Sequence, residues 1–210
     1  MTETVQMDGI SIKMKSDVEN WLDGEGARFL ERIGLKPGDR VLDFGCGSGH
    51  YTIPAARVVG AEGRVFALDR EGEVLGKLGQ AARDEGFANI EVGQTTGGWK
   101  IGFPDRSFDA ILAYDVLHYL EERELLFREF LRVLKREGFL SVYPKHRRDD
   151  YPLSHLARIT LEEIIAEIER SGFAWQGSFV EQVIHDEGYN RGIILKFAVH
   201  QSDYDGRSVQ

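Results

Sequence analysis

The chain lacks several features that mark particular classes of protein. It has a single cysteine, Cys46, and no apolar run that approaches the length of a membrane span. One cysteine excludes an internal disulfide and fits a reducing compartment. The first residues, Met1 to Thr4, are polar and acidic, unlike a secretory signal peptide. We therefore expect a cytoplasmic protein with one main domain.

Positive charge is also scarce relative to negative charge. The chain has 26 Lys and Arg against 35 Asp and Glu, a net charge of −9. An acidic surface repels phosphate backbones, so a nucleic-acid partner is disfavoured unless a local basic patch exists. The best candidate patch is Lys145 to Arg148, but Asp149 and Asp150 follow it directly. We interpret this segment as a solvated loop and expect a small-molecule partner.

Motifs of several common chemistries are missing. The chain contains no P-loop motif, no H-E-x-x-H zinc motif and no C-x-x-C pair. Its six histidines are scattered, and none forms a pair with metal-binding spacing. We therefore predict no bound metal ion. The histidines are His50, His118, His146, His155, His185 and His200.

The most informative stretch that is present reads VLDFGCGSGH, from Val41 to His50. An apolar strand from Arg40 to Phe44 leads into glycines at 45, 47 and 49, and a helix from about Tyr51 to Val59 follows. Glycine lets the backbone turn sharply and approach a ligand closely. The amides at a helix start are unpaired donors at the positive end of the helix dipole. This stretch predicts a binding site for a nucleotide-type cofactor.

A second apolar strand ends in a carboxylate. It runs from Arg64 to Asp69, and Asp69 lies 20 residues after Gly49. A carboxylate at this place can accept hydrogen bonds from both ribose hydroxyls. The alternative is that Asp69 only caps the following helix, from Glu71 to about Glu85. Because Asp69 occurs together with the glycine loop, we favour the interpretation that it binds the ribose.

Strands and helices alternate along the rest of the chain. Such alternation implies a parallel sheet with right-handed crossovers, to which a terminal pair of strands adds an antiparallel edge. Residues 1–17 look irregular, and residues 201–210 form a polar tail that we predict to be disordered. The other expected helices are 18–33, 121–135 and 161–171; the other expected strands are 89–94, 108–114, 139–143, 174–184 and 192–200, the last two joined by a loop at 186–190.

The spacing of the glycine loop separates two families of cofactor. The dinucleotide fingerprint G-x-G-x-x-G needs its third glycine where this chain has His50. The pattern D-x-G-x-G-x-G, which begins at Asp43, resembles motif I of class I S-adenosylmethionine (SAM)-dependent methyltransferases. Phe103 to Leu112 resembles the loop and fourth strand of the small-molecule enzymes of that class. Tyr114 to Leu120 resembles the segment that they place at the sulfonium.

The resemblance implies an α/β fold with a doubly wound, Rossmann-like sheet of seven strands in three α/β/α layers. The order would be 3-2-1-4-5-7-6, mostly parallel with strand 7 antiparallel. It covers about residues 26–200, and we expect residues 1–25 and the loop 144–159 to form a lid over the acceptor. The implied activity is methyl transfer from SAM to a small molecule, with S-adenosylhomocysteine as product. A nicotinamide-dependent oxidoreductase, a SAM-binding protein without catalysis and a protein or tRNA acceptor stay open as alternatives.

The site is expected at the carboxyl ends of the strands, where strands 1 and 4 adjoin. A base is needed only if the acceptor loses a proton, and the candidates are Asp115, His118 and His146. Family members often carry an acidic residue after strand 3 that accepts a hydrogen bond from the adenine amino group. This chain has Gln94, Thr95 and Thr96 at that place instead. The full set of expected cofactor contacts is Asp43, Gly45, Cys46, Gly47, Gly49, Tyr51, Thr52, Asp69, Arg70, Gln94, Thr95, Thr96, Asp115 and His118.

Overall fold

Seven strands form one mixed sheet, in the order β5-β4-β3-β6-β7-β9-β8. The computed structural model describes residues 4–7, 10–13, 15–96 and 99–200. Strand β9 is antiparallel to both of its neighbours, and the pairs among the first five strands are parallel. The predicted order and direction of the strands are therefore confirmed. The strands are β3 (Arg40–Phe44), β4 (Arg64–Asp69), β5 (Ile90–Gln94), β6 (Phe108–Tyr114), β7 (Leu134–Tyr143), β8 (Phe173–His185) and β9 (Gly188–Val199).

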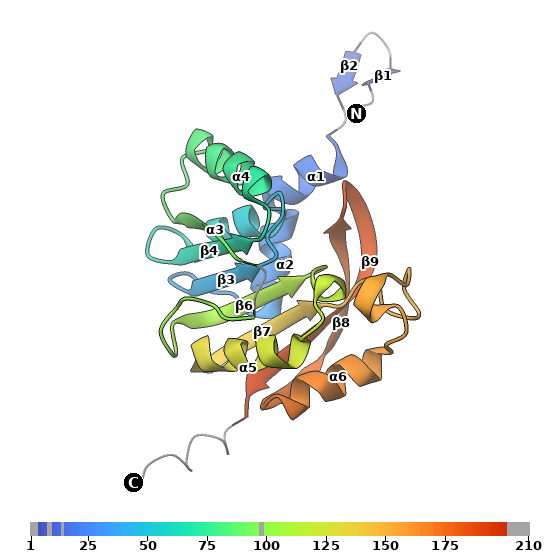
Figure 1. Ribbon diagram of the computed structural model, residues 1–210. Helices are drawn as coiled ribbons and strands as arrows, with labels where there is room; N and C mark the ends of the chain where they lie inside the picture. Colours follow the sequence, from blue (N-terminus) through green and yellow to red (C-terminus); the bar gives the residue numbers. More distant parts are fainter. Residues whose placement is uncertain (1–3, 8–9, 14, 97–98, 201–210) are drawn as a thin grey trace, which may run out of the picture.

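Helices cover both faces of this sheet (Figure 1). Along β3, Val41 packs with residues of the helices on one face, whereas Leu42 and Phe44 pack with those on the other. Both faces are apolar because a central strand covered on both sides meets no water. One face carries α2 (Gly26–Ile33), α3 (Thr52–Val59) and α4 (Gly72–Asp84); the other carries α5 (Arg123–Val133) and α6 (Leu161–Arg170).

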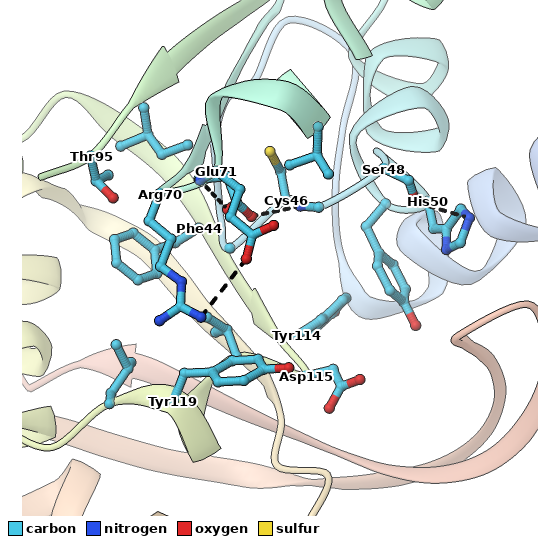
Figure 2. Close-up of a pocket in the computed structure, with 18 of the residues that line it drawn as sticks. Phe44, Cys46, Ser48, His50, Arg70, Glu71, Thr95, Tyr114, Asp115 and Tyr119 are labelled. Carbon is cyan, nitrogen blue, oxygen red and sulfur yellow. Dashed lines mark hydrogen bonds and ion pairs between the residues drawn. The ribbon is translucent and has the colours of Figure 1, made fainter. Parts of the chain in front are cut away.

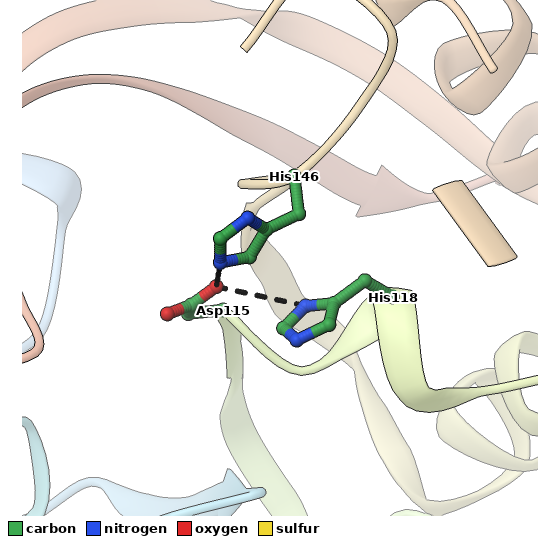
Figure 3. Close-up of side chains that lie close together, drawn as sticks. All are labelled: Asp115, His118 and His146. Atoms are coloured by element: carbon green, nitrogen blue, oxygen red, sulfur yellow. Dashed lines mark ion pairs between the residues drawn. The ribbon is translucent and has the colours of Figure 1, made fainter. Parts of the chain in front are cut away.

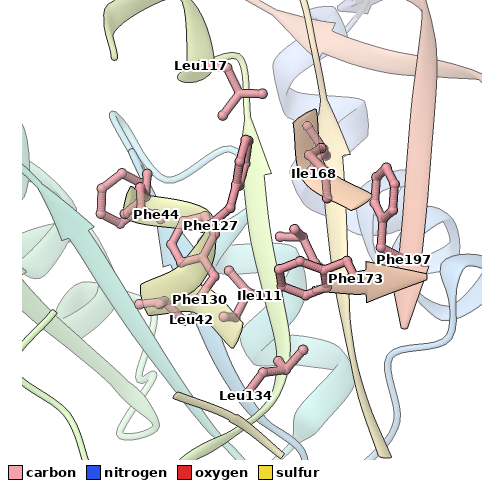
Figure 4. Close-up of a cluster of buried hydrophobic side chains, with 14 of the residues drawn as sticks. Leu42, Phe44, Ile111, Leu117, Phe127, Phe130, Leu134, Ile168, Phe173 and Phe197 are labelled. Carbon is pink, nitrogen blue, oxygen red and sulfur yellow. The ribbon is translucent and has the colours of Figure 1, made fainter. Parts of the chain in front are cut away.

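The largest group of buried apolar side chains lies between the sheet and the helices α5 and α6 (Figure 4). Phe127 and Phe130 of α5 are fully buried against Leu42 and Ile111 of the central strands. The spacing of these phenylalanines along α5 turns both toward the sheet. The cluster therefore fixes the positions of β3 and β6, whose carboxyl ends lead into the glycine loop and into Asp115. Among the described residues, no helix is long and apolar enough to cross a membrane.

The N-terminal part differs from the prediction. Residues 1–17 were expected to be irregular, but β1 (Thr4–Met7) and β2 (Ile10–Lys13) pair as antiparallel strands. Strands of four residues are at the lower limit of the length over which alternation indicates a strand, so the pattern is weak here. The expected helix at 18–33 is present as α1 (Asp17–Asn20), a π-helical turn (Trp21–Glu25) and α2. Trp21 is 1% exposed, so the end of the expected lid segment 1–25 belongs to the core.

Two boundaries on the second half of the sheet were also wrong. The helix expected to reach Lys135 ends at Val133, because Leu134 pairs with Phe108 and Lys135 Nζ lies 2.7 Å from Asp109 Oδ2. Tertiary pairing overrides local helix preference here. The hairpin loop expected at 186–190 is shorter, since Gly188 already pairs with His185 in the β8–β9 ladder. The predicted tail 201–210 lies outside the described residues.

Candidate cofactor and acceptor site

A cavity of about 770 Å³ opens over the carboxyl ends of β3, β4 and β6 (Figure 2). This is the place that the rule for open α/β sheets predicts. The sequence prediction and the lining of the cavity overlap in part. The expected residues that line it are Gly45, Cys46, Gly47, Tyr51, Asp69, Arg70, Thr95 and Asp115. The expected residues that are not part of the lining are Asp43, Gly49, Thr52, Gln94, Thr96 and His118.

The three loop glycines have different surroundings. All three have positive φ, at 77° for Gly45, 49° for Gly47 and 89° for Gly49. A Cβ on Gly45 would lie 2.4 Å from Val116 Cγ2, and one on Gly49 would lie 2.3 Å from Leu78 Cδ1. A Cβ on Gly47 would meet no described heavy atom within 4 Å. Gly45 and Gly49 are thus required by packing, whereas Gly47 presents bare backbone to the cavity.

Asp69 ties the end of β4 to the glycine loop. Its Oδ2 accepts the amide of Gly47 at 2.9 Å, and its Oδ1 accepts the amide of Glu71 at 3.0 Å. Each carboxylate oxygen has two acceptor positions, so both can take a further hydrogen bond. The side chain also lines the cavity. Asp69 therefore does more than begin the next helix: it holds Gly47 in place and keeps acceptor capacity for a bound hydroxyl.

Asp43 lies behind the loop rather than in the cavity. It is 2% exposed, and its Oδ2 accepts the hydroxyl of Thr52 at 2.6 Å. Burial raises the pKa of Asp43 to about 7, against the lowering effect of the Thr52 hydrogen bond. The pair joins the end of β3 to the first residue of α3. Asp43 and Thr52 thus support the loop from behind, and the cavity-side contacts belong to other residues.

Cys46 and the segment after β5 contribute a few residues to the lining of the cavity. Burial raises the pKa of the Cys46 thiol well above its usual range, so this thiol is not reactive. The side-chain amide of Gln94 donates a hydrogen bond to the carbonyl oxygen of Arg70 at 2.9 Å, so the Gln94 side chain points toward backbone. Thr95 and Trp99 line the cavity, and Trp99 is 42% exposed. Of the residues expected to replace the adenine-binding acid, Thr95 is therefore the one in place.

On the opposite side of the cavity, imidazoles cluster around Asp115, which itself lines the cavity (Figure 3). Oδ1 of Asp115 lies 3.6 Å from His118 Nδ1 and 3.6 Å from His146 Nε2. The fold thus brings together the three residues that were candidates for a base. It adds His185, whose Nδ1 lies 2.6 Å from Asp115 Oδ2. Sequence reasoning missed His185, because only the pairing of β8 with β9 brings it to this place.

His118 is the most deeply buried member of that cluster. It is 2% exposed, and neither of its ring nitrogens has a hydrogen-bond partner among the described residues. Burial lowers the pKa of His118 to about 4, helped by the nearby His146 and His185. Its imidazole is therefore neutral near pH 7. Burial also raises the pKa of Asp115, against the lowering effect of His185.

The basic segment after β7 is not the solvated loop that we expected. Lys145 is 1% exposed and Arg147 is 7% exposed. Both pair with Asp150, at 2.7 Å and 3.0 Å. The acidic residue that follows the basic run therefore neutralises it within a folded loop. This loop holds His146 beside Asp115, since His146 Nδ1 lies 2.9 Å from the carbonyl of Tyr151.

The comparisons with known proteins agree with this geometry. A family model described as a methyltransferase domain matches residues 35–204. The chain is 36% identical over 123 residues, 59% of its length and 51% of the relative's, to a 2-phytyl-1,4-naphtoquinone methyltransferase of Synechococcus elongatus. It is 32% identical over 153 residues, 70% of its length and 58% of the relative's, to a ubiquinone/menaquinone biosynthesis C-methyltransferase of Vibrio cholerae. The chain spans about half the length of these curated relatives.

A solved structure shares the fold across most of the chain. It is a SAM-dependent methyltransferase from Aquifex aeolicus, with a TM-score of 0.70 and 24% identity, and the match covers 88% of this chain and all of that one. The family model, the strand order and the glycine loop together define the class as class I SAM-dependent methyltransferases, whose cofactor is SAM. The chain belongs to the methyltransferase domain family.

The residues around the cavity fit that cofactor. Gly47 leaves open space where any other residue would project a side chain. Asp69 keeps acceptor capacity toward the cavity, and Glu71 adds a second carboxylate to the lining. Carboxylates at short range attract the cationic groups of SAM and repel a pyrophosphate. Asp43 adds little to this charge, because it lies outside the lining and burial raises its pKa to about 7.

Proposed function

We propose that this protein transfers the methyl group of SAM to a small molecule bound in the same cavity. The observation that carries the proposal is the continuity of the cavity. One space of about 770 Å³ joins Gly47 and Asp69 on one side to Asp115 and His185 on the other. A cofactor at the first side and an acceptor at the second would therefore share an enclosure, as a direct transfer requires.

In this proposal the cofactor supplies an activated methyl group, and the protein holds the reactants in line and excludes water. Asp69 accepts hydrogen bonds from the ribose, while Gly47 allows close approach of backbone. Thr95 and Trp99 bound the adenine side. Asp115, kept in orientation by His185, faces the acceptor side. No step of this arrangement needs an invariant base, since a base is required only when the acceptor must lose a proton.

We infer that the acceptor is a hydroxylated aromatic ring of the hydroquinone type. Both curated relatives compared above carry the names of quinone methyltransferases. The acceptor side of the cavity mixes apolar walls, such as Leu120 and Ile184, with the polar Asp115 and His185. A flat ring with hydroxyl groups matches such a lining, because its faces pack on apolar side chains and its edge takes hydrogen bonds.

In this proposal, the part of residues 1–25 that precedes the buried Trp21 forms a lid over the acceptor side. The end of that segment braces the hairpin whose β8 strand carries His185. Asp17 Oδ2 accepts the amide of Tyr189 at 3.0 Å, and the Tyr189 hydroxyl donates to Glu25. A segment fixed at this rim can cover the cavity with the residues that precede it.

A thermal-shift series with SAM, S-adenosylhomocysteine, NAD and NADP tests the choice of cofactor. We expect the first two to raise the melting temperature, by about 2.7 kcal/mol of stability at 100 times Kd. Radiolabelled SAM with a panel of hydroquinones then tests transfer. Stabilisation by NAD alone would support the oxidoreductase. SAM binding with no labelled product from any acceptor or cell extract would support a SAM-binding protein without catalysis.

A further inference from the structure

We propose that Asp115, His118 and His146 bind one divalent transition-metal ion of the zinc type. The nearest ligand atoms of these three side chains all lie within 4.8 Å of one another. They come from three places in the chain: the end of β6, the short 3-10 helix at Leu117–Tyr119 and the loop after β7. No sequence spacing predicts the site, since 28 positions separate His118 from His146.

The distances suit a tetrahedral ion. Two ligand atoms on a zinc ion, each bonded at about 2.0–2.1 Å, lie roughly 3.3–3.4 Å apart. Asp115 Oδ1 lies 3.6 Å from His118 Nδ1 and 3.6 Å from His146 Nε2. Figure 3 shows both rings pointing a nitrogen at that oxygen. These two distances need only a small contraction to match an ion, and the ligand atoms of His118 and His146 lie within 4.8 Å of each other.

The groups around the three residues hold them in the state that a metal requires. His146 Nδ1 lies 2.9 Å from the carbonyl oxygen of Tyr151, which can only accept, so Nδ1 carries the proton. In the neutral ring, Nε2 then presents its lone pair to the cluster. His185 meanwhile occupies the other oxygen of Asp115 at 2.6 Å. Metal-binding histidines and carboxylates are commonly oriented by such outer partners.

Buried polar atoms without partners are the second observation. Asp115 Oδ1 and both ring nitrogens of His118 have no hydrogen bond to any described residue. His118 is 2% exposed, so little water reaches its ring. A buried polar group without a partner is costly, and a carboxylate oxygen facing an imidazole lone pair adds repulsion. A cation bound to Asp115 Oδ1, His118 Nδ1 and His146 Nε2 removes this repulsion and gives Asp115 Oδ1 and His118 Nδ1 a partner.

The donor set indicates the kind of metal. Two imidazoles and one carboxylate match borderline divalent ions such as Zn²⁺, Co²⁺ and Fe²⁺, rather than Ca²⁺ or Mg²⁺, which prefer oxygen. Three protein ligands leave a fourth position for water or a substrate oxygen. Asp115 also lines the cavity, so the ion would lie beside the proposed acceptor side. The existence of the metal site does not depend on the proposed methyl transfer.

Cobalt titration of the full chain, stripped of metal with a chelator, tests the site without SAM or acceptor. We expect one Co²⁺ per chain with the intense visible bands of four-coordinate cobalt, and displacement by Zn²⁺. Asp115→Asn should weaken Zn²⁺ binding at least about 100-fold, since it removes a ligand charge, while His185→Gln should weaken it about 10-fold. Asn tolerates the positive φ of 53° at Asp115. His200→Gln, at an exposed histidine near the end of β9, is the matched control.

The variant His118→Phe separates loss of metal binding from loss of folded structure. Phenylalanine keeps a ring at this buried position without unpartnered nitrogens, so the metal-free variant should be at least as stable as the wild type. It should nevertheless lose the rise in melting temperature that Zn²⁺ gives the wild type. A wild-type chain that binds Co²⁺ no more tightly than Asp115→Asn overturns the proposal. Equal loss in His200→Gln, or a Zn²⁺ response that persists in His118→Phe, does so too.

Discussion

The two sides of the cavity are built in different ways. The cofactor side uses one continuous stretch, Asp43 to Thr52, and the end of the neighbouring strand at Asp69. The side chains of Asp43 and Asp69 both have partners, on Thr52, Gly47 and Glu71. The residues of the opposite side, Asp115, His118, His146 and His185, come from four separate elements. Three buried polar atoms there have no hydrogen-bond partner among the described residues.

This difference separates a side whose carboxylates are held by hydrogen bonds within the protein from one whose buried polar atoms are only partly satisfied by it. The hydrogen bond from Gly47 to Asp69 shapes the loop before any ligand arrives. By contrast, Asp115 Oδ1 lies 3.6 Å from each of two imidazole nitrogens and has no hydrogen-bond partner among the described residues. We therefore expect substitutions on the cofactor side to reduce binding through lost shape. Substitutions on the acceptor side should act through lost ligation.

The largest effect is expected from Gly47→Val, which should abolish SAM binding. Gly47 has a φ of 49° and lines the cavity, so a branched side chain both strains the turn and fills cofactor space. Calorimetry on a variant with a native circular dichroism spectrum measures this. Gly86→Val is the control, because Gly86 also has positive φ, at 78°, with open space around it. Wild-type affinity in Gly47→Val would refute the glycine-loop assignment.

Asp69→Ala should weaken SAM binding by about 1.5–3 kcal/mol, the scale of hydrogen bonds to a charged group. The loss combines the ribose contacts with the anchor of the Gly47 amide. Asp84→Ala changes an exposed carboxylate on α4 and should leave SAM affinity unchanged. Unchanged affinity in Asp69→Ala would remove this residue from the cofactor site.

The pH dependence of stability should carry a contribution from Asp43. Its folded pKa of about 7 lies above the unfolded value of about 3.9, so the folded state retains a proton that the unfolded state releases. Stability therefore falls as pH rises between these values, by about 1–2 kcal/mol from pH 5 to 7. Urea denaturation of Asp43→Asn should show a flatter profile over this window. Parallel profiles for the two proteins would contradict the raised pKa.

The smallest effect on the cofactor side is expected from the N-terminal segment. Deleting residues 1–15 keeps Ser16, whose hydroxyl accepts the amide of Glu19 and caps α1. The truncated protein should fold and bind SAM within about twofold of the full chain, since α1 and its contacts remain. Transfer to the acceptor should be lost. A truncated protein that does not fold would assign the segment to the core, and full transfer activity would end the lid hypothesis.

Much of the fold could be predicted because its signals are local. The parallel sheet follows from strand–helix alternation, and its strand order is implied by the family resemblance carried by Asp43 to Gly49. The errors fall where a distant contact decides a boundary. Leu134 leaves the expected helix because Phe108 is there to pair with it. Lys145 and Arg147 are buried because Asp150 neutralises them in a folded loop.

The sequence by itself determined the position of the glycine loop and of Asp69, since the loop and its strand are contiguous and Asp69 ends the neighbouring strand. Only the tertiary structure decided the acceptor side. His185 reaches Asp115 across 70 positions of the chain, and it does so through the antiparallel β8–β9 pair. The tertiary structure also distinguished the glycines by role. Gly45 packs against Val116 and Gly49 against Leu78, whereas Gly47 has open space beside it. Spacing along a chain reports contacts within an element, whereas contacts between elements depend on how the sheet and its loops close in space.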